Sequence, residues 1–162
     1  MIKPHSQHPD GRGSRTTITV RTFNFATDFT AVIALWANAG AGIHLRRSDE
    51  TQEIQKKLQR DPDLFLVAEI ENPGSADHAI VGAVLGGFDG RRGMVYHLAV
   101  AEAYRKQGIA VQLMQELEFR LRTKGCIRSY LLVTADNLEA IRFYEAQNWK
   151  RMDLFAYGKD LD

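Results

Sequence analysis

One long amphipathic helix, directly preceded by three apolar strands, constrains the fold of this chain most. Ile109, Leu113, Leu117 and Leu121 recur every fourth residue and therefore share one helical face. A helix with a single apolar stripe needs another layer to cover that stripe. The runs before it are rich in β-branched and apolar residues and are joined by turn residues, among them Asn72-Pro73-Gly74, which predicts antiparallel strands. The strands are expected at Leu64–Ile70, Ala79–Phe88 and Met94–Val100, and the helix at Gly108–Lys124.

The rest of the chain adds strands and helices on both sides of this unit. They are expected as a strand at Thr17–Thr22, helices at Thr27–Asn38 and Glu50–Arg60, a strand at Ile127–Thr134, a helix at Asn137–Asn148 and a last strand or hairpin at Trp149–Tyr157. Ser48 and Asp49 are the candidate capping residues for the second of these helices. The order β-α-α-β-β-β-α-β-α-β is neither strict βαβ alternation nor all-β. It predicts an α/β (α+β) fold with a mixed, mostly antiparallel, twisted sheet between helices.

Composition limits the function classes. A chain of 162 residues forms one domain by default, expected over 17–162 behind a flexible tail at 1–16 that carries His5 and His8 without a metal cage. The net charge of +1 argues against a nucleic-acid binder. No apolar run is long enough to span a membrane. Because Cys126 is the single cysteine, an internal disulfide and a cysteine-rich zinc site are excluded, and a reducing cytoplasmic location is expected.

The segment 95–110 carries the clearest chemical signal. A buried strand leads through a short basic loop into the long helix, whose first N–H groups and positive dipole end favour an anion. Gly108 and Ala110 leave the backbone open to close approach, and Arg105 and Lys106 add positive charge. The pattern indicates a phosphate or pyrophosphate cradle, although a basic loop without a ligand remains an alternative.

A second candidate segment covers 136–145 and also follows a strand, so it is expected at the same edge of the sheet. It contains the aromatic pair Phe143 and Tyr144. In isolation, such a pair is more typical of a packed core than of a catalytic site.

Together, these two segments resemble the GNAT acetyltransferase superfamily over residues 17–157. Arg105, Gly108 and Ala110 fit its Q/R-x-x-G-x-G/A motif, and the preceding strand ends in the frequent Leu98-Ala99-Val100. The later signature is matched by Asn137, Ala140, Phe143 and Tyr144. The segment 42–49 is similar to the GIxLRxxD sequence of a bacterial branch whose substrate is unassigned.

The resemblance implies that acetyl-CoA lies in a splay between the fourth and fifth strands of a GNAT-like fold. Its pantetheine arm would follow the fourth strand, and its pyrophosphate would sit on the start of the long helix. The implied cofactor-binding residues are Leu98, Ala99, Val100, Arg105, Lys106, Gln107, Gly108, Ile109, Ala110, Asn137 and Tyr144.

The resemblance also implies direct attack of an amine on the thioester, with Tyr144 as the acid for the leaving thiolate and a backbone N–H near Leu98 as the oxyanion donor. Met94 stands where some histone-directed members carry a glutamate base, so His97 is the nearest titratable replacement; a histidine packed under the sheet is the alternative. Trp36, His44 and Arg46 are the candidate acceptor-side residues, with His44 a second candidate base and Arg46 equally readable as a solvated charge.

The lack of a carboxylate base on the expected fourth strand bears on the class of acceptor. At pH 7 roughly one in seven α-amines is neutral, against about one in 2,500 lysines. A small molecule or an α-amine is therefore favoured over a protein lysine, and a homodimer is left open. Two other classes compete with this interpretation: a non-catalytic acyl-CoA-binding module, and an ATP- or NAD-binding protein. The chain lacks both G-x-x-x-x-G-K-[ST] and strict βαβ order, which disfavours the nucleotide-binding class.

Overall fold

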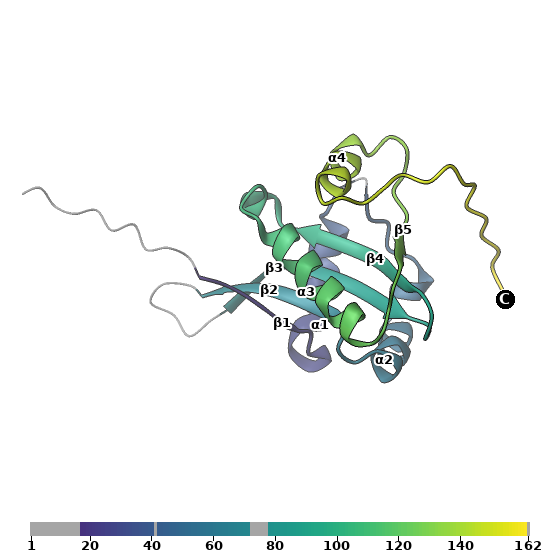
Figure 1. Cartoon of the computed structure of the whole chain (residues 1–162). Helices are drawn as coiled ribbons and strands as arrows, with labels where there is room; N and C mark the ends of the chain where they lie inside the picture. Colours follow the sequence, from purple (N-terminus) through teal and green to yellow (C-terminus); the bar gives the residue numbers. More distant parts are fainter. Residues whose placement is uncertain (1–16, 41, 72–77, 162) are drawn as a thin grey trace, which may run out of the picture.

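A computed structural model describes residues 17–40, 42–71 and 78–161. The tail expected at 1–16 and the turn expected at 72–74 lie outside these residues. A five-stranded sheet in the order β1-β2-β3-β4-β5 forms the centre of the molecule (Figure 1). Its strands are β1 (Ile18–Thr22), β2 (Phe65–Glu71), β3 (His78–Phe88), β4 (Gly93–Val100) and β5 (Ser129–Leu131). The first four are antiparallel neighbours, and β5 pairs with β4 in parallel. The predicted mixed, mostly antiparallel sheet is confirmed.

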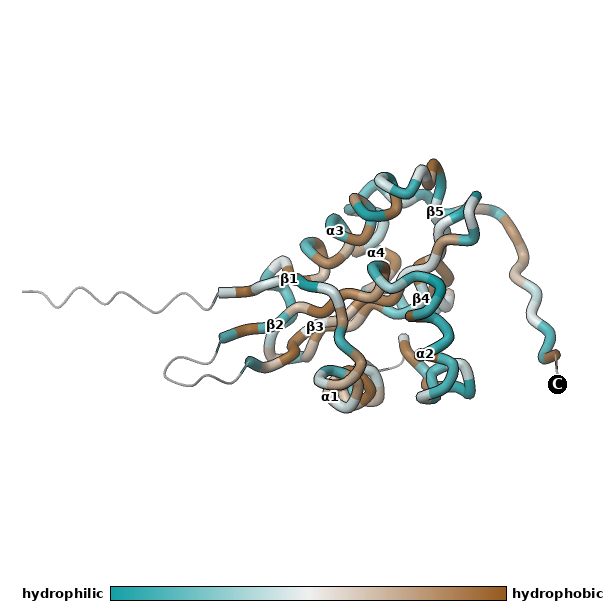
Figure 2. Tube along the Cα trace, turned by 90° about the horizontal axis from the view of Figure 1, so that it is seen from below, coloured by the Kyte–Doolittle hydropathy of each residue, from teal (hydrophilic) through white to brown (hydrophobic). Residues whose placement is uncertain are grey.

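Helices cover both faces of this sheet. They are α1 (Phe25–Ala37), the short 3-10 helix η1 (Arg47–Asp49), α2 (Thr51–Arg60), the 3-10 helix η2 (Glu102–Tyr104), α3 (Ile109–Thr123) and α4 (Leu138–Ala146). Figure 2 shows α3 on one side of the sheet and α1 and α2 on the other. The leucine stripe of α3 packs on one face, and Trp36 of α1 packs on the other beside Phe65. The two apolar faces of the strands explain the near-continuous burial of β2.

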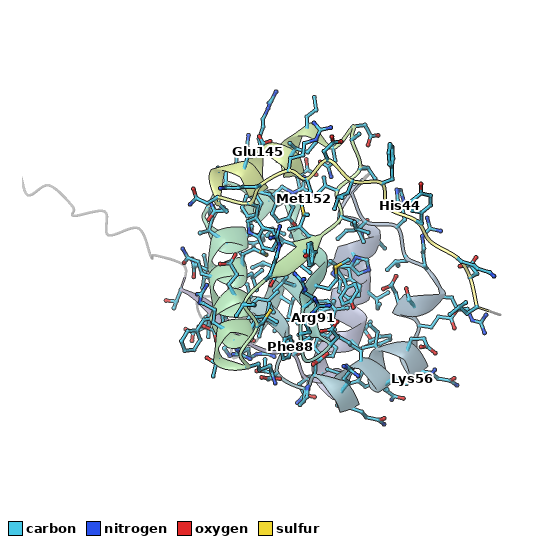
Figure 3. The ribbon with its side chains drawn as sticks, turned by 45° about the vertical axis from the view of Figure 1, so that its right-hand side comes forward. His44, Lys56, Phe88, Arg91, Glu145 and Met152 are labelled. Atoms are coloured by element: carbon cyan, nitrogen blue, oxygen red, sulfur yellow. The ribbon has the colours of Figure 1, made fainter. Side chains whose placement is uncertain are left out.

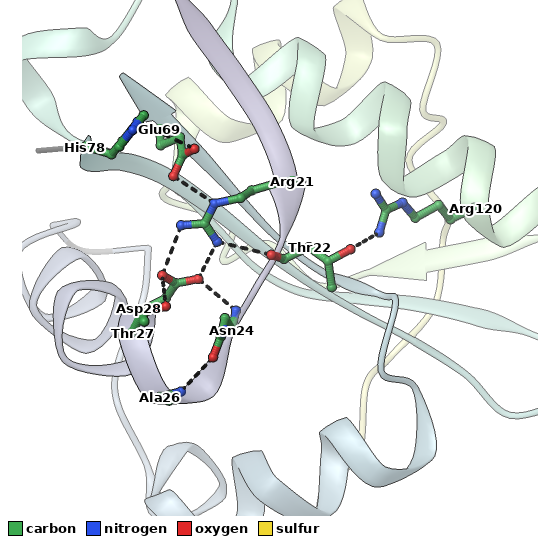
Figure 4. Close-up of polar contacts among 9 residues, drawn as sticks. All are labelled: Arg21, Thr22, Asn24, Ala26, Thr27, Asp28, Glu69, His78 and Arg120. Atoms are coloured by element: carbon green, nitrogen blue, oxygen red, sulfur yellow. Dashed lines mark hydrogen bonds and ion pairs between the residues drawn. The ribbon is translucent and has the colours of Figure 1, made fainter. Parts of the chain in front are cut away.

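A cluster of buried charge fixes the start of α1 (Figure 4). Asn24 caps the helix by accepting a hydrogen bond from the Ala26 N–H at 3.0 Å, so the helix begins two residues before the predicted Thr27. Arg21 of β1 donates to Asp28 at 2.6 Å and to Glu69 of β2 at 2.7 Å. These contacts join β1, α1 and β2 into one unit.

The pairing between β4 and β5 stops early. It runs from Gly93 opposite Ser129 to Val95 opposite Leu131, and β4 then continues to Val100 without β5. A bulge occurs at the same point, because Leu85 faces His97 and Gly86 faces Val95, which leaves Tyr96 as an extra residue. Bulges of this kind bend a strand and often lie beside functional sites. The predicted splay between the fourth and fifth strands is confirmed.

The end of the chain differs from the prediction. The last strand or hairpin expected at Trp149–Tyr157 is absent, since residues 149–161 contain no helix or strand. Leu154, Phe155 and Tyr157 are exposed there. The fifth strand covers three residues instead of the expected Ile127–Thr134, because its pairing partner diverges after Val95. A local β pattern forms a strand only where a neighbouring strand offers hydrogen bonds.

Candidate functional site

The splay opens into a cleft of about 760 Å³ between β4, the segment after β5, and the beginnings of α3 and α4. The structure brings ten of the eleven predicted cofactor-binding residues to its wall: Leu98, Ala99, Val100, Arg105, Lys106, Gly108, Ile109, Ala110, Asn137 and Tyr144. Gln107 is exposed outside the lining, and its side chain donates to the Ala103 carbonyl at 3.3 Å. Trp36, His44, Arg46 and His97 also lie outside it.

The edge of β4 presents backbone groups to this cleft. The Ala101 N–H bonds to the Val81 carbonyl of β3 at 2.8 Å. Because successive residues of a strand point their N–H groups to opposite edges, the N–H groups of Val100 and Leu98 face the cleft. The part of the chain that the structure describes offers no strand partner to this edge beyond Val95. A ligand with amide groups can therefore pair with it as a neighbouring strand would.

Arg105 supports the wall of the cleft. Its guanidinium donates to the Val100 carbonyl through Nε and to the Ala39 carbonyl through Nη2, both at 3.1 Å. The side chain therefore joins the end of β4 to the end of α1. Sequence reasoning expected this charge beside a phosphate, and its contacts within the protein were not foreseen.

The beginning of α3 forms the second wall. Gly108 is its N-cap, with φ of +80°, and a Cβ placed there would meet nothing within 4 Å. The first N–H to bond back into the helix belongs to Gln112, which reaches the Gly108 carbonyl at 3.0 Å. The N–H groups of residues 109–111 are thus available to an anion. Ile109 is buried in the core and fixes their direction.

Tyr144 lies on the opposite wall, on α4. Its ring packs edge-on against Phe143 and Trp149, with centroids 5.1 and 6.0 Å away. Burial raises the pKa of Tyr144 to about 12. Among the described residues the hydroxyl has no hydrogen-bond partner. Its oxygen is not fully buried, and the residue lines the cleft. It is therefore a neutral donor that opens to the cleft.

Asn137 begins α4 at the mouth of the cleft. Its side-chain oxygen accepts from the Ala140 N–H at 3.1 Å, which makes it the N-cap of the helix. Its amide nitrogen faces Gly42, where an added Cβ would lie only 2.7 Å away. The residue thus caps α4 and packs closely against the segment after α1 at the opening.

His97 lies outside the cleft lining, although its two neighbours in β4, Tyr96 and Leu98, both line the cleft. Its Nε2 is 2.9 Å from Oδ1 of Asp49, which is buried in η1. Its ring packs edge-on against Trp36 at 4.8 Å between centroids. Sequence reasoning read Asp49 as a helix-capping residue and missed this contact, because no local pattern connects two residues 48 positions apart.

The other acceptor-side candidates are dispersed. Trp36 is fully buried, and its ring packs edge-on against His97. His44 is exposed on the segment after α1 (Figure 3). A hydrogen bond from Thr134 holds the pKa of Asp136, a residue of the cleft wall, below its usual value, and His44 acts in the same direction. Arg46 is exposed and lines a separate shallow hollow with Phe29 and Asp49.

Comparison with known proteins identifies the family. Residues 30–149 match the Acetyltransferase (GNAT) family, and this range contains the cleft, both its helix starts and Tyr144. The chain belongs to the GNAT acetyltransferase family. The predicted family is confirmed, and the protein is an acyl-CoA N-acetyltransferase.

Bacterial relatives carry the same designation. An acetyltransferase of Pectobacterium atrosepticum is 42% identical over 135 residues, covering 83% of this chain and 89% of the relative. An acetyltransferase of Yersinia enterocolitica is 38% identical over 143 residues, with 88% and 94% covered. These matches extend over nearly the whole GNAT domain.

Solved structures share the fold at low identity. The NatC complex bound to Gag peptide and CoA has a chain that matches with a TM-score of 0.71 at 21% identity, covering 84% of this chain and 86% of that one. The aminoglycoside acetyltransferase AAC(6')-Iy, in complex with a CoA-linked bisubstrate analogue, matches with a TM-score of 0.67 at 15% identity, with 90% and 99% covered.

The GNAT cleft of this chain fits acetyl-CoA, its cosubstrate. The unpaired edge of β4 suits the amides of a pantetheine arm, and the free N–H groups at the start of α3 suit a pyrophosphate. The open space over Gly108 leaves room for close approach of a phosphate. No helix within the described residues is long and apolar enough to cross a membrane.

Proposed function

We propose that this GNAT protein acetylates a primary amine by direct attack in a ternary complex, and that the acceptor is a small molecule or an α-amine. One observation carries the proposal: the free β4 edge, the anion-binding start of α3 and the Tyr144 hydroxyl all meet in one cleft. Acetyl-CoA supplies the activated acetyl group: the amine nitrogen bonds to its carbonyl carbon, the carbon–sulfur bond breaks, and an amide and the free thiol result.

Tyr144 donates a hydrogen bond to the sulfur as that bond breaks. With a pKa of about 12, the phenol is a weaker acid than a thiol with a pKa near 8.5. Complete transfer of its proton would be uphill by about 5 kcal/mol. Stabilisation of the developing negative charge by the hydrogen bond is the favoured role, and solvent then supplies the proton of the thiol.

The backbone of β4 stabilises the carbonyl oxygen. The Leu98 N–H faces the cleft on the unpaired edge of the strand, next to the bulge at Tyr96. Such a fixed N–H is a typical oxyanion donor, because it is oriented before the reaction begins.

His97 accepts the proton that the amine loses. Its side chain is 19% exposed, and its neighbours Tyr96 and Leu98 both line the cleft. A general base that does not touch the reacting amine can accept its proton through one bridging water molecule. His44, exposed and within electrostatic reach of Asp136, contributes to acceptor binding, while Trp36 acts through His97. Arg46 contacts the acceptor only if that molecule extends over η1.

The preference for a small or α-amino acceptor rests on the absence of a carboxylate on β4 at Met94. The solved relatives differ in what they hold beside CoA, since one complex contains a peptide and another a bisubstrate analogue that joins CoA to an acetylneamine. A cytoplasmic location is supported by the buried free thiol of Cys126. A homodimer remains an expectation of the family resemblance, and light scattering of the purified chain tests it.

Release of free thiol from acetyl-CoA in the presence of a panel of amines tests the proposal. The panel contains polyamines, an aminoglycoside, peptides with a free α-amine and blocked lysines, and peptides with the reverse pattern. We expect amine-dependent release with at least one of the first three classes. Binding of acetyl-CoA without release for any amine would instead favour a non-catalytic acyl-CoA-binding module, and release with the lysine peptides alone would contradict the acceptor class.

A further inference from the structure

We propose that Asp49 is a positioning residue for His97: its carboxylate fixes the imidazole in the tautomer that leaves Nδ1 as the proton acceptor. This inference rests on the proposed function, in which His97 takes the proton of the amine. It concerns a residue of η1 that lies outside the cleft lining and that sequence reasoning assigned only to helix capping.

Both oxygens of Asp49 are committed. Oδ2 accepts from the Arg46 N–H at 2.9 Å, and Oδ1 faces Nε2 of His97 at 2.9 Å. An ionised carboxylate can only accept hydrogen bonds, so Nε2 must carry the hydrogen that joins the two residues. In a neutral imidazole the lone pair available for a proton is then on Nδ1.

The other ring nitrogen is free to act. Within the described residues, no hydrogen bond reaches Nδ1 of His97. This atom is also not fully buried. Solvent therefore reaches Nδ1, while Nε2 faces a side chain that is only 6% exposed. The arrangement separates an anchored nitrogen from an accessible one.

Packing limits rotation of the ring. Trp36 is fully buried and meets the imidazole edge-on, with an interplanar angle of 66°. Turning the ring to exchange its two nitrogens would break the hydrogen bond to Asp49 and displace this contact. The pair therefore holds both the orientation and the tautomer of His97.

A purely structural role for Asp49 is the competing explanation, because the same contact also ties η1 to β4. Asp49→Asn separates the two roles. The amide oxygen of asparagine can still accept from the Arg46 N–H, while its NH₂ group faces Nε2 and can only donate. Nε2 must then become the acceptor, and the hydrogen moves to Nδ1.

Long-range ¹H–¹⁵N NMR of the full chain, recorded at rising pH until the ¹⁵N signals of His97 stop shifting, reads the tautomer of the neutral ring directly. The His97 signals are assigned by their loss in His97→Gln. We expect the Nε2–H form in the wild-type protein and the Nδ1–H form in Asp49→Asn. An Nδ1–H form in the wild type, or no change in the variant, would overturn the inference whether or not any amine is acetylated.

Kinetics with the best amine of the panel then tests the consequence. We expect kcat to fall about 100-fold in Asp49→Asn, with KM for acetyl-CoA changed less than twofold, and Asp49→Glu to recover part of kcat. Asp28→Asn is the matched control, because Asp28 is also a buried carboxylate but pairs with Arg21. It should lower the melting temperature and leave kcat and the His97 tautomer unchanged.

The two proposals fail in different ways. Full activity of His97→Gln would remove His97 as the base and this inference with it. Lost activity in His97→Gln together with normal kcat in Asp49→Asn would overturn the positioning role alone and leave the acetyl transfer intact.

Discussion

The two sides of the cleft are built differently. The cofactor side consists of the β4 edge and the start of α3, which are close in sequence and present mainly backbone N–H groups. The acceptor side that we propose lies next to the cleft lining and joins α1, η1 and β4 through side chains that are far apart in sequence, such as Asp49 and His97. The first is a product of local chain geometry, and the second depends on tertiary packing.

This difference separates binding from chemistry. A backbone wall is insensitive to most side-chain replacements but vulnerable wherever backbone conformation or space is changed. A side-chain cluster can be altered one atom at a time while the cofactor wall remains intact. We therefore expect substitutions on the two sides to affect Kd and kcat separately.

The largest effect is expected at Gly108. Gly108→Val places a β-branched residue at a φ of +80° and fills the space above the free N–H groups, so acetyl-CoA affinity should fall by about 100-fold or more. Gly90→Val is the matched control, because Gly90 has a φ of +95° with nothing near its Cβ position and lies in the β3–β4 turn. Equal losses of affinity in the two variants, measured by calorimetry, would refute a local role for Gly108.

The next effect concerns Tyr144. Tyr144→Phe should lower kcat about 10- to 100-fold and leave the acetyl-CoA Kd unchanged, because only the hydroxyl is removed from an intact wall. Tyr130→Phe is the control, since the Tyr130 hydroxyl instead accepts from Arg92 outside the cleft. Steady-state kinetics checks both variants, and an unchanged kcat in Tyr144→Phe would remove this residue from the chemistry.

The pH dependence of kcat sharpens the same assignment. Burial raises the pKa of Tyr144 to about 12, so its donor form persists through the range near pH 10 where an ordinary tyrosine ionises. We expect no tyrosine-dependent decrease in kcat as the pH rises to about 10. A decrease near that pH that disappears in Tyr144→Phe would contradict the buried environment.

A moderate effect is expected from Arg105. Arg105→Lys removes the planar fork that joins the Val100 and Ala39 carbonyls, so KM for acetyl-CoA should rise about fivefold, as expected for loss of about 1 kcal/mol. Arg120→Lys is the control. Arg120 also makes two hydrogen bonds, to the Asp63 carbonyl and to the Glu116 carboxylate, and these contacts lie outside the cleft. An unchanged KM in Arg105→Lys would show that the wall holds its position without this residue.

The smallest effect is expected at Gln107. Among the described residues, its exposed side chain bonds to the Ala103 carbonyl alone, so Gln107→Ala should change the acetyl-CoA Kd by less than about twofold. Titration calorimetry checks this. A tenfold loss would mean that the cofactor side uses side chains outside the wall described above.

The cofactor side could be predicted from the sequence because its information is local. The leucine period of α3 and the Arg105–Ala110 motif adjoin one another, and a helix following a strand places its N-terminus at the sheet edge. The splay was predictable only through the family resemblance, since the pairing that ends at Val95 is a property of two distant strands.

The acceptor side was less predictable for the same physical reason. Trp36 has the aromatic character of a binding residue, but its burial against Phe65 is decided by tertiary packing. Asp49 carries the signature of a cap, and its second contact with His97 depends on how η1 folds back onto β4. The last strand expected at Trp149–Tyr157 does not form, because residue preference alone supplies no pairing partner.

Calorimetric titration of acetyl-CoA into Gly108→Val and Asp49→Asn side by side tests the separation of binding from chemistry most directly. We predict that Gly108→Val loses affinity by about 100-fold or more, while Asp49→Asn binds within about twofold of the wild type despite its reduced turnover. Comparable loss of affinity in Asp49→Asn would contradict the account, because the two sides of the cleft would then act as one.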